Sequence, residues 1–153
     1  MNVLVTGAAG YIGSELIDYL LKDGYKVAAI DNLMYDPTSL LRYTNNPNFS
    51  FVKGDVRNVK LMTMLMNDAD IIIPLAALVG FPLCEEDPRS AQEINHDVNT
   101  WIAQTKREDQ KVIYPCTNSG YGVSVDGSVC TEESPLNPIS LYGRTKVAAE
   151  KEY

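Results

Sequence analysis

Three glycines near the start of the chain, spaced as Gly7-x-x-Gly10-x-x-Gly13, separate a short apolar run from an amphipathic stretch. The apolar run covers residues 3–5 and is rich in β-branched side chains, which predicts a buried strand. The stretch that begins at Tyr11 has the period of a helix. The sequence therefore predicts a strand, a tight glycine turn and a helix in immediate succession. We expect one face of this helix to lie on a sheet through its apolar residues Ile12, Leu16, Tyr19 and Leu20.

Each glycine of this turn has a physical use. Gly7 allows a tight turn after the strand, Gly10 lets a pyrophosphate approach the backbone, and Gly13 permits close packing of the helix on the strand. The N–H groups at the start of the helix then point toward phosphate oxygens. The alternative is a glycine-containing turn without a ligand, but the strand before it and the helix after it favour a dinucleotide site.

A carboxylate stands where a dinucleotide-binding fold needs one. Residues 26–30 predict a second buried strand, and Asp31 follows directly, 24 residues after Gly7. A carboxylate at this position can accept hydrogen bonds from both ribose hydroxyls of an adenosine, whereas it would repel a 2′-phosphate. The sequence therefore predicts NAD as the cofactor rather than NADP.

Strand-like and helix-like segments alternate along the rest of the chain. Predicted strands cover residues 49–52, 70–74 and 112–114, and predicted helices cover 39–43, 59–66, about 85–106 and a last segment after Pro138. Asn58 is a candidate N-cap, and Glu85-Glu86-Asp87-Pro88 would open a helix with acidic residues first. The faces that we expect to be buried carry Val59, Met62 and Met66 in one helix and Ile94, Val98, Trp101 and Ile102 in the next.

This alternation predicts an α/β protein, with a Rossmann-type doubly wound parallel sheet in which the first strand lies beside the fourth. A polar loop with Gly120, Gly122 and Gly127 precedes the last helix.

The composition restricts the possible functions. The 153 residues suit a single domain, and the net charge of −7 is opposite to the basic footprint of a nucleic-acid-binding protein. The three cysteines lack metal-ligand spacing and His96 is the only histidine, so we expect no metal site, no disulfide framework and no Ser-His-Asp hydrolase. No apolar run approaches membrane-spanning length, and the N-terminus lacks a secretory signal. We therefore expect a cytoplasmic protein without membrane or nucleic-acid partners.

Two residues of the last predicted helix, Tyr142 and Lys146, lie one turn apart. An ammonium on the same helix face favours the ionised form of a phenol. A phenolate can remove a proton from a sugar or alcohol hydroxyl while a hydride passes to nicotinamide. Thr117, after the strand predicted at 112–114, could hold the substrate oxygen. An ordinary exposed helix pair is the alternative, because the Tyr-x-x-x-Lys spacing alone is a weak signal.

Seven segments, taken in chain order, carry a specific resemblance. They are TGAAGYIG at 6–13, DNL at 31–33, GDVRN at 54–58, PLAA at 74–77, Asn95, CTNSGYG at 116–122 and YGRTK at 142–146. In these segments the chain resembles the extended short-chain dehydrogenase/reductase family, in its NAD-dependent epimerase/dehydratase branch, and is most similar to the UDP-glucose 4-epimerase group. The resemblance implies a Rossmann domain over residues 1–153. It also implies that bound NAD takes a hydride from a carbon of a nucleotide-diphosphate sugar and returns it to the other face.

The resemblance assigns roles to individual residues. It implies that Thr117, Tyr142 and Lys146 are catalytic. The cofactor-binding residues that it implies are Gly7, Gly10, Tyr11, Ile12, Gly13, Asp31, Asn32, Asp55, Val56, Leu75, Ala76, Ala77, Asn95, Tyr142 and Lys146. Within this set, Asp31 and Asn32 would hold the adenosine ribose, and Asp55 and Val56 would flank the adenine. The helices at 87–106 and 138–153 are implied to form the interface of a homodimer.

Two departures from the family pattern leave alternatives open. Asn118 and Ser119 follow Thr117 where dehydratases of the family have an Asp-Glu pair, so dehydration ranks below epimerisation or simple oxidoreduction. The chain stops seven residues after Lys146, so we expect the last strands and the C-terminal substrate lobe of the family to be missing. One hypothesis is an NAD-dependent nucleotide-sugar epimerase, represented by its N-terminal part. The other is a non-catalytic NAD-binding half-domain that needs a partner chain.

Overall fold

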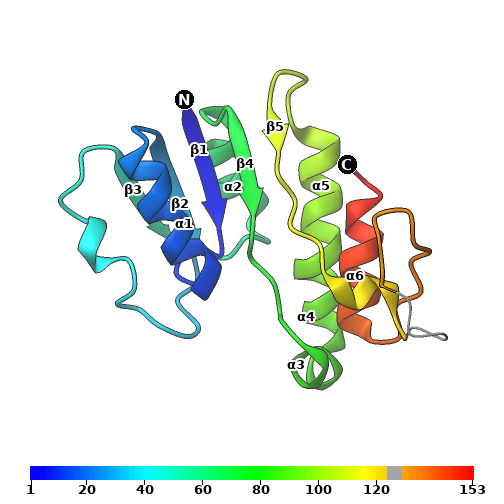
Figure 1. Cartoon of the computed structure of the whole chain (residues 1–153). Coiled ribbons are helices and arrows are strands. Elements are labelled where there is room, and N and C mark those ends of the chain that lie inside the picture. The colour runs from blue at the N-terminus through cyan, green and yellow to red at the C-terminus, as the bar shows by residue number, and fades with distance from the viewer. Residues whose placement is uncertain (124–128) are drawn as a thin grey trace. The chain divides into compact units, whose positions relative to one another are not determined.

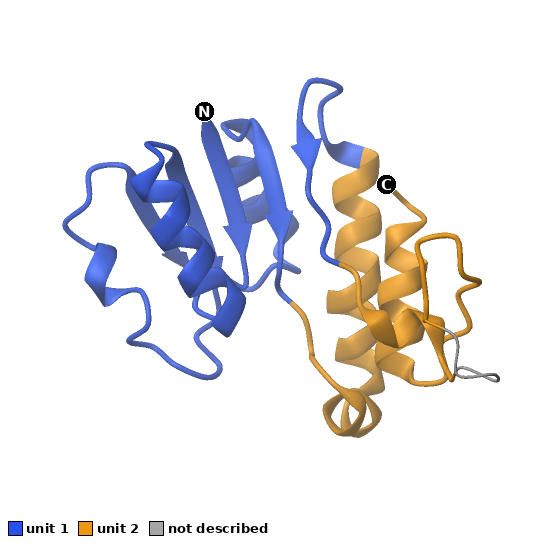
Figure 2. Cartoon of the chain, viewed as in Figure 1, with its two compact units in different colours: residues 1–76, 105–115 blue, residues 77–104, 116–153 orange. Residues whose placement is uncertain are grey.

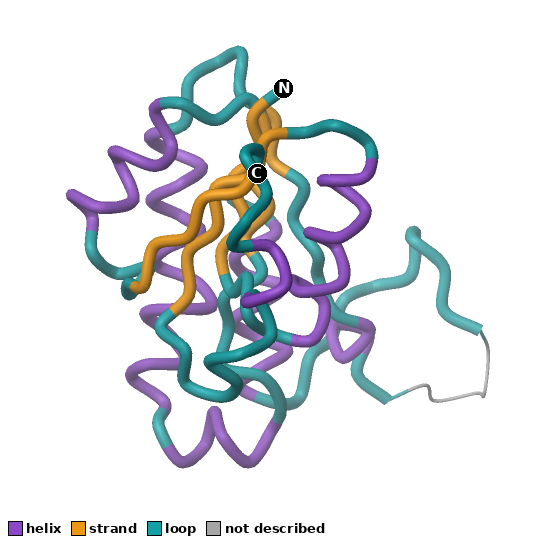
Figure 3. The backbone as a smooth tube through the Cα atoms, turned by 90° about the vertical axis from the view of Figure 1, so that its left-hand side faces the viewer, coloured by secondary structure: helices purple, strands orange, loops and turns teal. Residues whose placement is uncertain are grey.

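Five parallel strands form one sheet in the order β3-β2-β1-β4-β5, which places the first strand beside the fourth as predicted (Figure 1). The structure is a computed structural model that describes residues 1–123 and 129–153, so Gly127 lies outside the described residues. The strands are β1 (Asn2–Thr6), β2 (Lys26–Asp31), β3 (Phe49–Lys53), β4 (Ile71–Pro74) and β5 (Lys111–Val112). Figure 3 shows the alternation of strands and helices along the chain. The predicted Rossmann-like α/β fold is confirmed.

The chain divides into two compact units (Figure 2). Unit 1 comprises residues 1–76 and 105–115 and contains the whole sheet, and unit 2 comprises residues 77–104 and 116–153. The helices of unit 1 are α1 (Tyr11–Lys22), the 3-10 helix η1 (Leu41–Tyr43) and α2 (Val59–Asn67). Those of unit 2 are α3 (Phe81–Glu86), α4 (Pro88–Gln92), the π-helix η2 (Glu93–Asp97), α5 (Val98–Thr105, of which Thr105 belongs to unit 1), the 3-10 helix η3 (Asn118–Tyr121) and α6 (Leu141–Glu150). The single domain expected over residues 1–153 stays a prediction.

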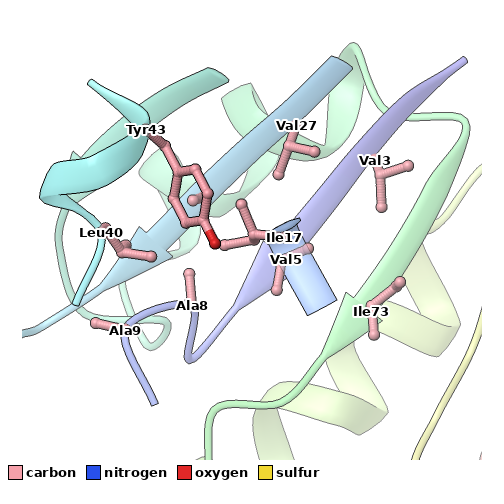
Figure 4. Packing of buried hydrophobic residues seen from close by; sticks show 10 residues of the cluster. Val3, Val5, Ala8, Ala9, Ile17, Val27, Leu40, Tyr43 and Ile73 are labelled. Atoms are coloured by element: carbon pink, nitrogen blue, oxygen red, sulfur yellow. The ribbon is translucent and has the colours of Figure 1, made fainter. Parts of the chain in front are cut away.

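The core of unit 1 follows from the alternation of side chains across the sheet. Buried residues of β1, β2 and β4 form a cluster with α1 and with the segments around them. Its members are Val3, Val5, Ala8, Ala9, Ile17, Val27, Ala29, Leu40, Tyr43 and Ile73. Figure 4 shows Ile17 of α1 next to Val5 of β1 within this cluster. The apolar strand residues predicted from the sequence therefore do anchor α1 on the sheet.

The buried face of α1 differs from the predicted one. Gly13 and Ile17 are the buried residues of the helix, whereas Ile12 and Tyr19 are 61% and 66% exposed. Leu16 and Leu20, the other two residues predicted to be buried, are partly buried and pack against the cluster. The close contact of Gly13 with the glycine turn sets the rotation of the helix, and this rotation turns Ile12 and Tyr19 outward. The prediction was therefore wrong for Ile12 and Tyr19.

α2 lies behind the sheet in Figure 1, whereas α1 lies in front of it. Asn58 caps α2 as predicted, because its side-chain oxygen accepts a hydrogen bond from Leu61 N at 3.1 Å. Met62 and Met66 are buried as expected, but Val59 is 54% exposed. Val59 lies on the same face as Met62 and Met66, but it is the first residue of α2 and is therefore exposed at the end of the helix. The prediction of a buried Val59 was wrong.

The helix expected to open at Glu85 is instead interrupted at Asp87. α3 already begins at Phe81, and α4 begins after Asp87, whose side chain accepts a hydrogen bond from Ser90 N at 3.0 Å. The break has a local cause, since a residue that precedes a proline disfavours the helical conformation, and Pro88 follows. The acidic start is thus correct for Asp87, whereas Glu85 and Glu86 end the preceding helix.

The buried face of the long helical segment contains polar residues that the sequence pattern did not indicate. Ile94 and Ile102 are buried as predicted, and the predicted Val98 and Trp101 are only partly buried. Asn95 and Asn99, at 0% and 2% exposure, take their place. The π-turn of η2 adds a residue to one helical turn and so rotates this face.

Two predicted elements are shorter than expected. β5 has two residues, although Ile113 N still donates to Ile72 O at 3.0 Å, and η1 is a single 3-10 turn at Leu41–Tyr43. Within residues 1–123 and 129–153, no helix has the length and apolar character needed to cross a membrane.

Candidate functional site

The glycine turn of unit 1 is built by close backbone contacts. Gly7 has a φ of +62°, and a Cβ on it would lie 2.6 Å from Ala76 N, which no side chain tolerates. A Cβ on Gly13 would lie 2.5 Å from Gly7 O, so only glycine lets α1 start this close to β1. Gly10 N donates to Gly7 O at 3.1 Å and closes the turn. The predicted uses of Gly7 and Gly13 in the turn thus have a clear geometric basis.

The start of α1 is open to a ligand. Gly10 is the N-cap and carries no capping side chain, and Tyr11 is 90% exposed. The first N–H groups of a helix have no partner within the helix. Together with the partial positive charge of the helix start, they suit an anionic pyrophosphate. The residues present therefore fit the phosphate part of a dinucleotide.

Asp31 is held firmly beside this turn. Its Oδ2 accepts a hydrogen bond from Ala9 N at 3.0 Å, and its Oδ1 accepts one from Leu33 N at 2.7 Å. Leu33 has a φ of +61°, a left-handed conformation that non-glycine residues seldom adopt. Each carboxylate oxygen has a second lone pair, so Asp31 can still accept two hydroxyl donors. The neighbouring Asn32 is exposed, and its Oδ1 accepts from Met34 N at 3.0 Å.

The other predicted cofactor residues of unit 1 lie at the ends of neighbouring strands. Asp55 follows β3 and is half-buried, whereas the side chain of Val56 is buried at 7% exposure. Leu75 and Ala76 follow β4, where Leu75 N donates to Thr6 O at 3.2 Å and Ala76 N to Thr6 Oγ1 at 3.1 Å. These contacts fix both residues against the end of β1.

In unit 2, α6 carries Tyr142 and Lys146. Ser140 caps the helix, because its Oγ accepts a hydrogen bond from Gly143 N at 3.0 Å. A Cβ on Gly143 would lie 3.0 Å from Ser119 O, so glycine lets α6 approach the segment that follows Thr117. The local sequence thus brings the predicted catalytic residues into one neighbourhood.

The Thr117 hydroxyl lies near enough to the Tyr142 phenol to lower the pKa of that phenol. Thr117 Oγ1 also accepts from Ser119 N at 3.2 Å, which fixes the threonine rotamer. Burial nevertheless raises the pKa of Tyr142 overall, because its effect is larger than that of Thr117. The direction is opposite to the lowered pKa expected from the Tyr-x-x-x-Lys spacing, because burial outweighs the other influences.

Lys146 is 5% exposed, which is unusual for a lysine. Burial lowers the pKa of its ammonium to about 8, and the neighbouring Cys116 and Glu150 raise that pKa again. Sequence reasoning missed both neighbours, although Glu150 lies one helical turn after Lys146 and Cys116 directly precedes Thr117. Burial also raises the pKa of the Cys116 thiol.

Asn95 is the centre of a buried polar network in unit 2. Its Oδ1 accepts from Leu78 N at 2.8 Å, and its Nδ2 donates to Leu78 O at 2.9 Å and to Thr145 Oγ1 at 3.4 Å. Thr145 Oγ1 in turn donates to Tyr142 O at 3.0 Å. Asn95 therefore supports α6 at the residue before Lys146. Ala77, the last predicted cofactor residue, is half-buried.

No group of three or more His, Cys, Asp or Glu side chains among residues 1–123 and 129–153 could hold a metal ion. The three cysteines, all in the described part, are free thiols, with Cys84 buried and Cys130 exposed.

Comparison with known proteins gives the context of this geometry. The model of the NAD dependent epimerase/dehydratase family matches residues 3–153. A low-salt glycan biosynthesis protein of Haloferax volcanii is 34% identical, with 98% of this chain and 50% of the relative covered. The UDP-glucose 4-epimerase of Mycolicibacterium smegmatis is 32% identical, with 98% of this chain and 49% of the relative covered.

Solved structures of nucleotide-sugar epimerases are also similar to this chain. The UDP-Glc/GlcNAc 4-epimerase of Campylobacter jejuni superposes with a TM-score of 0.88 at 26% identity, covering 98% of this chain and 47% of that structure. The UDP-glucuronic acid 4-epimerase of Bacillus cereus, in complex with UDP-glucuronic acid and NAD, gives 0.88 at 30% identity, covering 99% and 51%. The chain thus spans about half the length of the relatives that it matches. Because the family model covers nearly all of its residues, the chain belongs to the NAD dependent epimerase/dehydratase family.

Proposed function

We propose that this chain binds NAD and takes part in the epimerisation of a nucleotide-diphosphate sugar by transient hydride transfer at a sugar carbon. The observation that carries the proposal is the close approach of α6, which holds Tyr142 and the buried Lys146 one turn apart, to the segment that follows Thr117. Membership of the family supplies the reaction class. Relatives solved with NAD and with UDP-sugars support the choice of cofactor and substrate.

Cofactor binding is assigned first to unit 1. The proposed pyrophosphate contacts come from Gly7, Gly10, Tyr11, Ile12 and Gly13, the ribose contacts from Asp31 and Asn32, the adenine contacts from Asp55 and Val56, and further contacts from Leu75 and Ala76. The acceptors left on Asp31 favour the two free hydroxyls of NAD over the 2′-phosphate of NADP. In unit 2, the proposal assigns cofactor contacts to Ala77, Asn95, Tyr142 and Lys146.

Proton transfer is assigned to unit 2. Bound NAD would supply a reversible hydride acceptor. Tyr142 Oη would take the proton of the sugar hydroxyl during oxidation and return it during reduction, while the Thr117 hydroxyl holds the same substrate oxygen. Because burial raises the pKa of Tyr142, this step needs a positive charge that offsets burial, and the proposal assigns that role to the Lys146 ammonium one helical turn away. Because the hydride returns from the cofactor and the proton returns from Tyr142, no net redox change occurs in the sugar.

The cofactor assignment is tested at Asp31. NAD and NADP affinities of the 153-residue chain would be measured by calorimetry for the natural sequence, Asp31→Ala and the control Asp23→Ala, an exposed aspartate after α1. We expect a clear NAD preference that Asp31→Ala reduces about tenfold and Asp23→Ala leaves unchanged. Equal affinity of the natural chain for both cofactors would contradict the ribose assignment.

The proton-transfer assignment is tested at Tyr142. Tyr142→Phe should retain NAD binding and lose turnover of UDP-sugars, whereas Tyr19→Phe, which changes a tyrosine that is 66% exposed, should retain both. Turnover that survives Tyr142→Phe would exclude the phenol as the proton acceptor.

A second candidate function follows from the length of the relatives. Because the chain spans about half of them, an NAD-binding half-domain that needs a partner chain is the alternative. It predicts NAD binding without sugar turnover, and turnover that appears when the remaining half of a relative is added. A homodimer through residues 87–106 and 138–153 is part of the proposal, and light scattering measures it. Dehydratase or reductase activity ranks lower, because Asn118 and Ser119 offer no acid or base beside Thr117.

A further inference from the structure

An ion pair lies at the carboxyl edge of the sheet in unit 1. Arg57 Nη2 lies 2.6 Å from Asp55 Oδ2, and Arg57 Nε lies 3.0 Å from Oδ1 and 3.2 Å from Oδ2. A main-chain hydrogen bond adds to these contacts, since Arg57 N donates to Asp55 Oδ1 at 2.9 Å. Exposed ion pairs contribute little to stability, and the side chains of Asp55 and Arg57 are 38% and 39% exposed. Four contacts between residues two positions apart therefore fix the orientation of the Asp55 carboxylate, although they add little stability.

This carboxylate stands next to the proposed ribose ligand. β2 and β3 pair with Asp31 opposite Lys53, and Gly54 N donates to Asp31 O at 3.0 Å. Asp55 is thus two residues beyond the partner of Asp31, at the strand end where open parallel sheets bind their ligands. If Asp31 holds the adenosine ribose, as proposed above, the base of the same nucleoside lies toward β3.

Asp55 and Val56 place a hydrogen-bond acceptor, the carboxylate, next to a hydrogen-bond donor, the Val56 N–H. Three N–H donors of Arg57 share the two oxygens, because Nε is bifurcated between Oδ1 at 3.0 Å and Oδ2 at 3.2 Å, so one of the four acceptor positions of the carboxylate remains. For the Val56 N–H, the described residues provide no hydrogen-bond partner, and the buried Val56 side chain anchors this peptide. Adenine presents the complementary edge, an amine that donates and a ring nitrogen that accepts. Hypoxanthine presents the reverse, an oxygen that accepts and a ring N–H that donates.

We propose that Arg57 is a positioning residue that sets base specificity, because it holds Asp55 where the carboxylate accepts the exocyclic amine of adenine. The inference rests on the proposed function, since it needs the adenosine of the cofactor at Asp31. It goes beyond that function in assigning a role to Arg57, which makes no contact with the base itself.

The test compares two cofactors that differ only at the base. Dissociation constants of the 153-residue chain for NAD and for nicotinamide hypoxanthine dinucleotide would be measured by calorimetry. The variants are Arg57→Ala, Arg57→Lys and Asp55→Asn. The matched control is Arg89→Ala, which removes another exposed arginine, 2.7 Å from Glu93 in its own ion pair. Thermal unfolding of each variant separates loss of specificity from loss of fold.

We expect the natural chain and Arg89→Ala to prefer NAD about tenfold or more, as for a hydrogen bond to a charged group. Arg57→Ala and Asp55→Asn should reduce this preference below about threefold, and Arg57→Lys should give an intermediate value, because a single ammonium cannot hold both oxygens. A preference that stays unchanged in Arg57→Ala and Arg57→Lys would overturn the inference, even if overall affinity fell. Equal binding of both cofactors by the natural chain would also overturn it. Absence of NAD binding in the natural chain would instead refute the proposed function on which the inference rests.

Discussion

Asn95 holds the main chain of Leu78 with both ends of its amide, accepting from Leu78 N at 2.8 Å and donating to Leu78 O at 2.9 Å. The side chain is fully buried, so neither backbone group has water as a substitute partner. Through Thr145, the same amide reaches the turn of α6 between Tyr142 and Lys146. A buried amide thus links the segment after β4 to the helix of the proposed catalytic residues.

Replacement of Asn95 should destabilise the protein strongly. Asn95→Ala leaves the buried Leu78 N–H without a partner and the Leu78 carbonyl with only the weak Cys84 Sγ donor at 3.2 Å, and we expect the free energy of unfolding to fall by about 3 kcal/mol. Gln104→Ala, an exposed amide in α5, is the matched control and should change it by less than about 0.5 kcal/mol. Urea denaturation followed by circular dichroism measures both. Similar small losses in the two variants would mean that the contacts with Leu78 carry little energy.

Gln110 should stabilise unit 1 in a comparable way. Its Nε2 donates to Met66 O at 2.5 Å and to Ala69 O at 2.7 Å, and its Oε1 accepts from Arg107 N at 2.9 Å. Met66 lies in the last turn of α2 and Ala69 two residues after the helix; Met66 O also accepts from Ala69 N at 3.1 Å and Ala69 O from Arg107 Nη2 at 3.2 Å, but Gln110 makes the shortest contact with each carbonyl. We expect Gln110→Ala to lower the free energy of unfolding by about 2 kcal/mol. The exposed Gln104→Ala again serves as the control, and a loss no larger than in that variant would refute the role.

Two glycines should respond differently to alanine. In Gly13→Ala the new Cβ would lie 2.5 Å from Gly7 O, and we expect a loss of about 3 kcal/mol because backbone must move. Gly24 has no atom within 4 Å of its Cβ position, so Gly24→Ala should cost only about 1 kcal/mol for its φ of +81°. Equal losses, measured by chemical denaturation, would show that the contact between α1 and the glycine turn is not tight.

The buried Lys146 predicts a dependence of stability on pH. Its pKa is about 8 in the folded chain and 10.5 as the ordinary value, so between these pH values the unfolded chain binds more protons. Stability contributed by this group therefore rises with pH from about 8 to about 10.5, by up to about 3 kcal/mol.

The comparison with Lys146→Met isolates this contribution. The variant has no titrating group at this position, so its free energy of unfolding should lack the rise. Tyrosines whose pKa burial raises, such as Tyr153, lower the stability above about pH 10 in both proteins and cancel in the difference. Curves that stay parallel between pH 7 and pH 10 would show that the ammonium is not desolvated.

Sequence alone determined the local elements correctly where a few neighbouring residues decide the structure. Asn58 caps α2, and the glycine turn joins β1 to α1 as expected, because caps and turns depend on residues within a few positions. The alternation of strands and helices also determined the strand order, since crossover rules leave few arrangements. The order of motifs was enough to indicate the family.

The tertiary structure decided what depends on distant partners. The rotation of α1 follows from the contact of Gly13 with the turn, which exposes Ile12 against the apolar pattern. The burial of Asn95 and Gln110 depends on carbonyl and amide groups 17 and 41 or more residues away, and no periodicity in the sequence encodes such pairs. The pKa of Lys146 likewise depends on the packing around α6, because desolvation is a property of everything that surrounds a charge rather than of its neighbours in the chain.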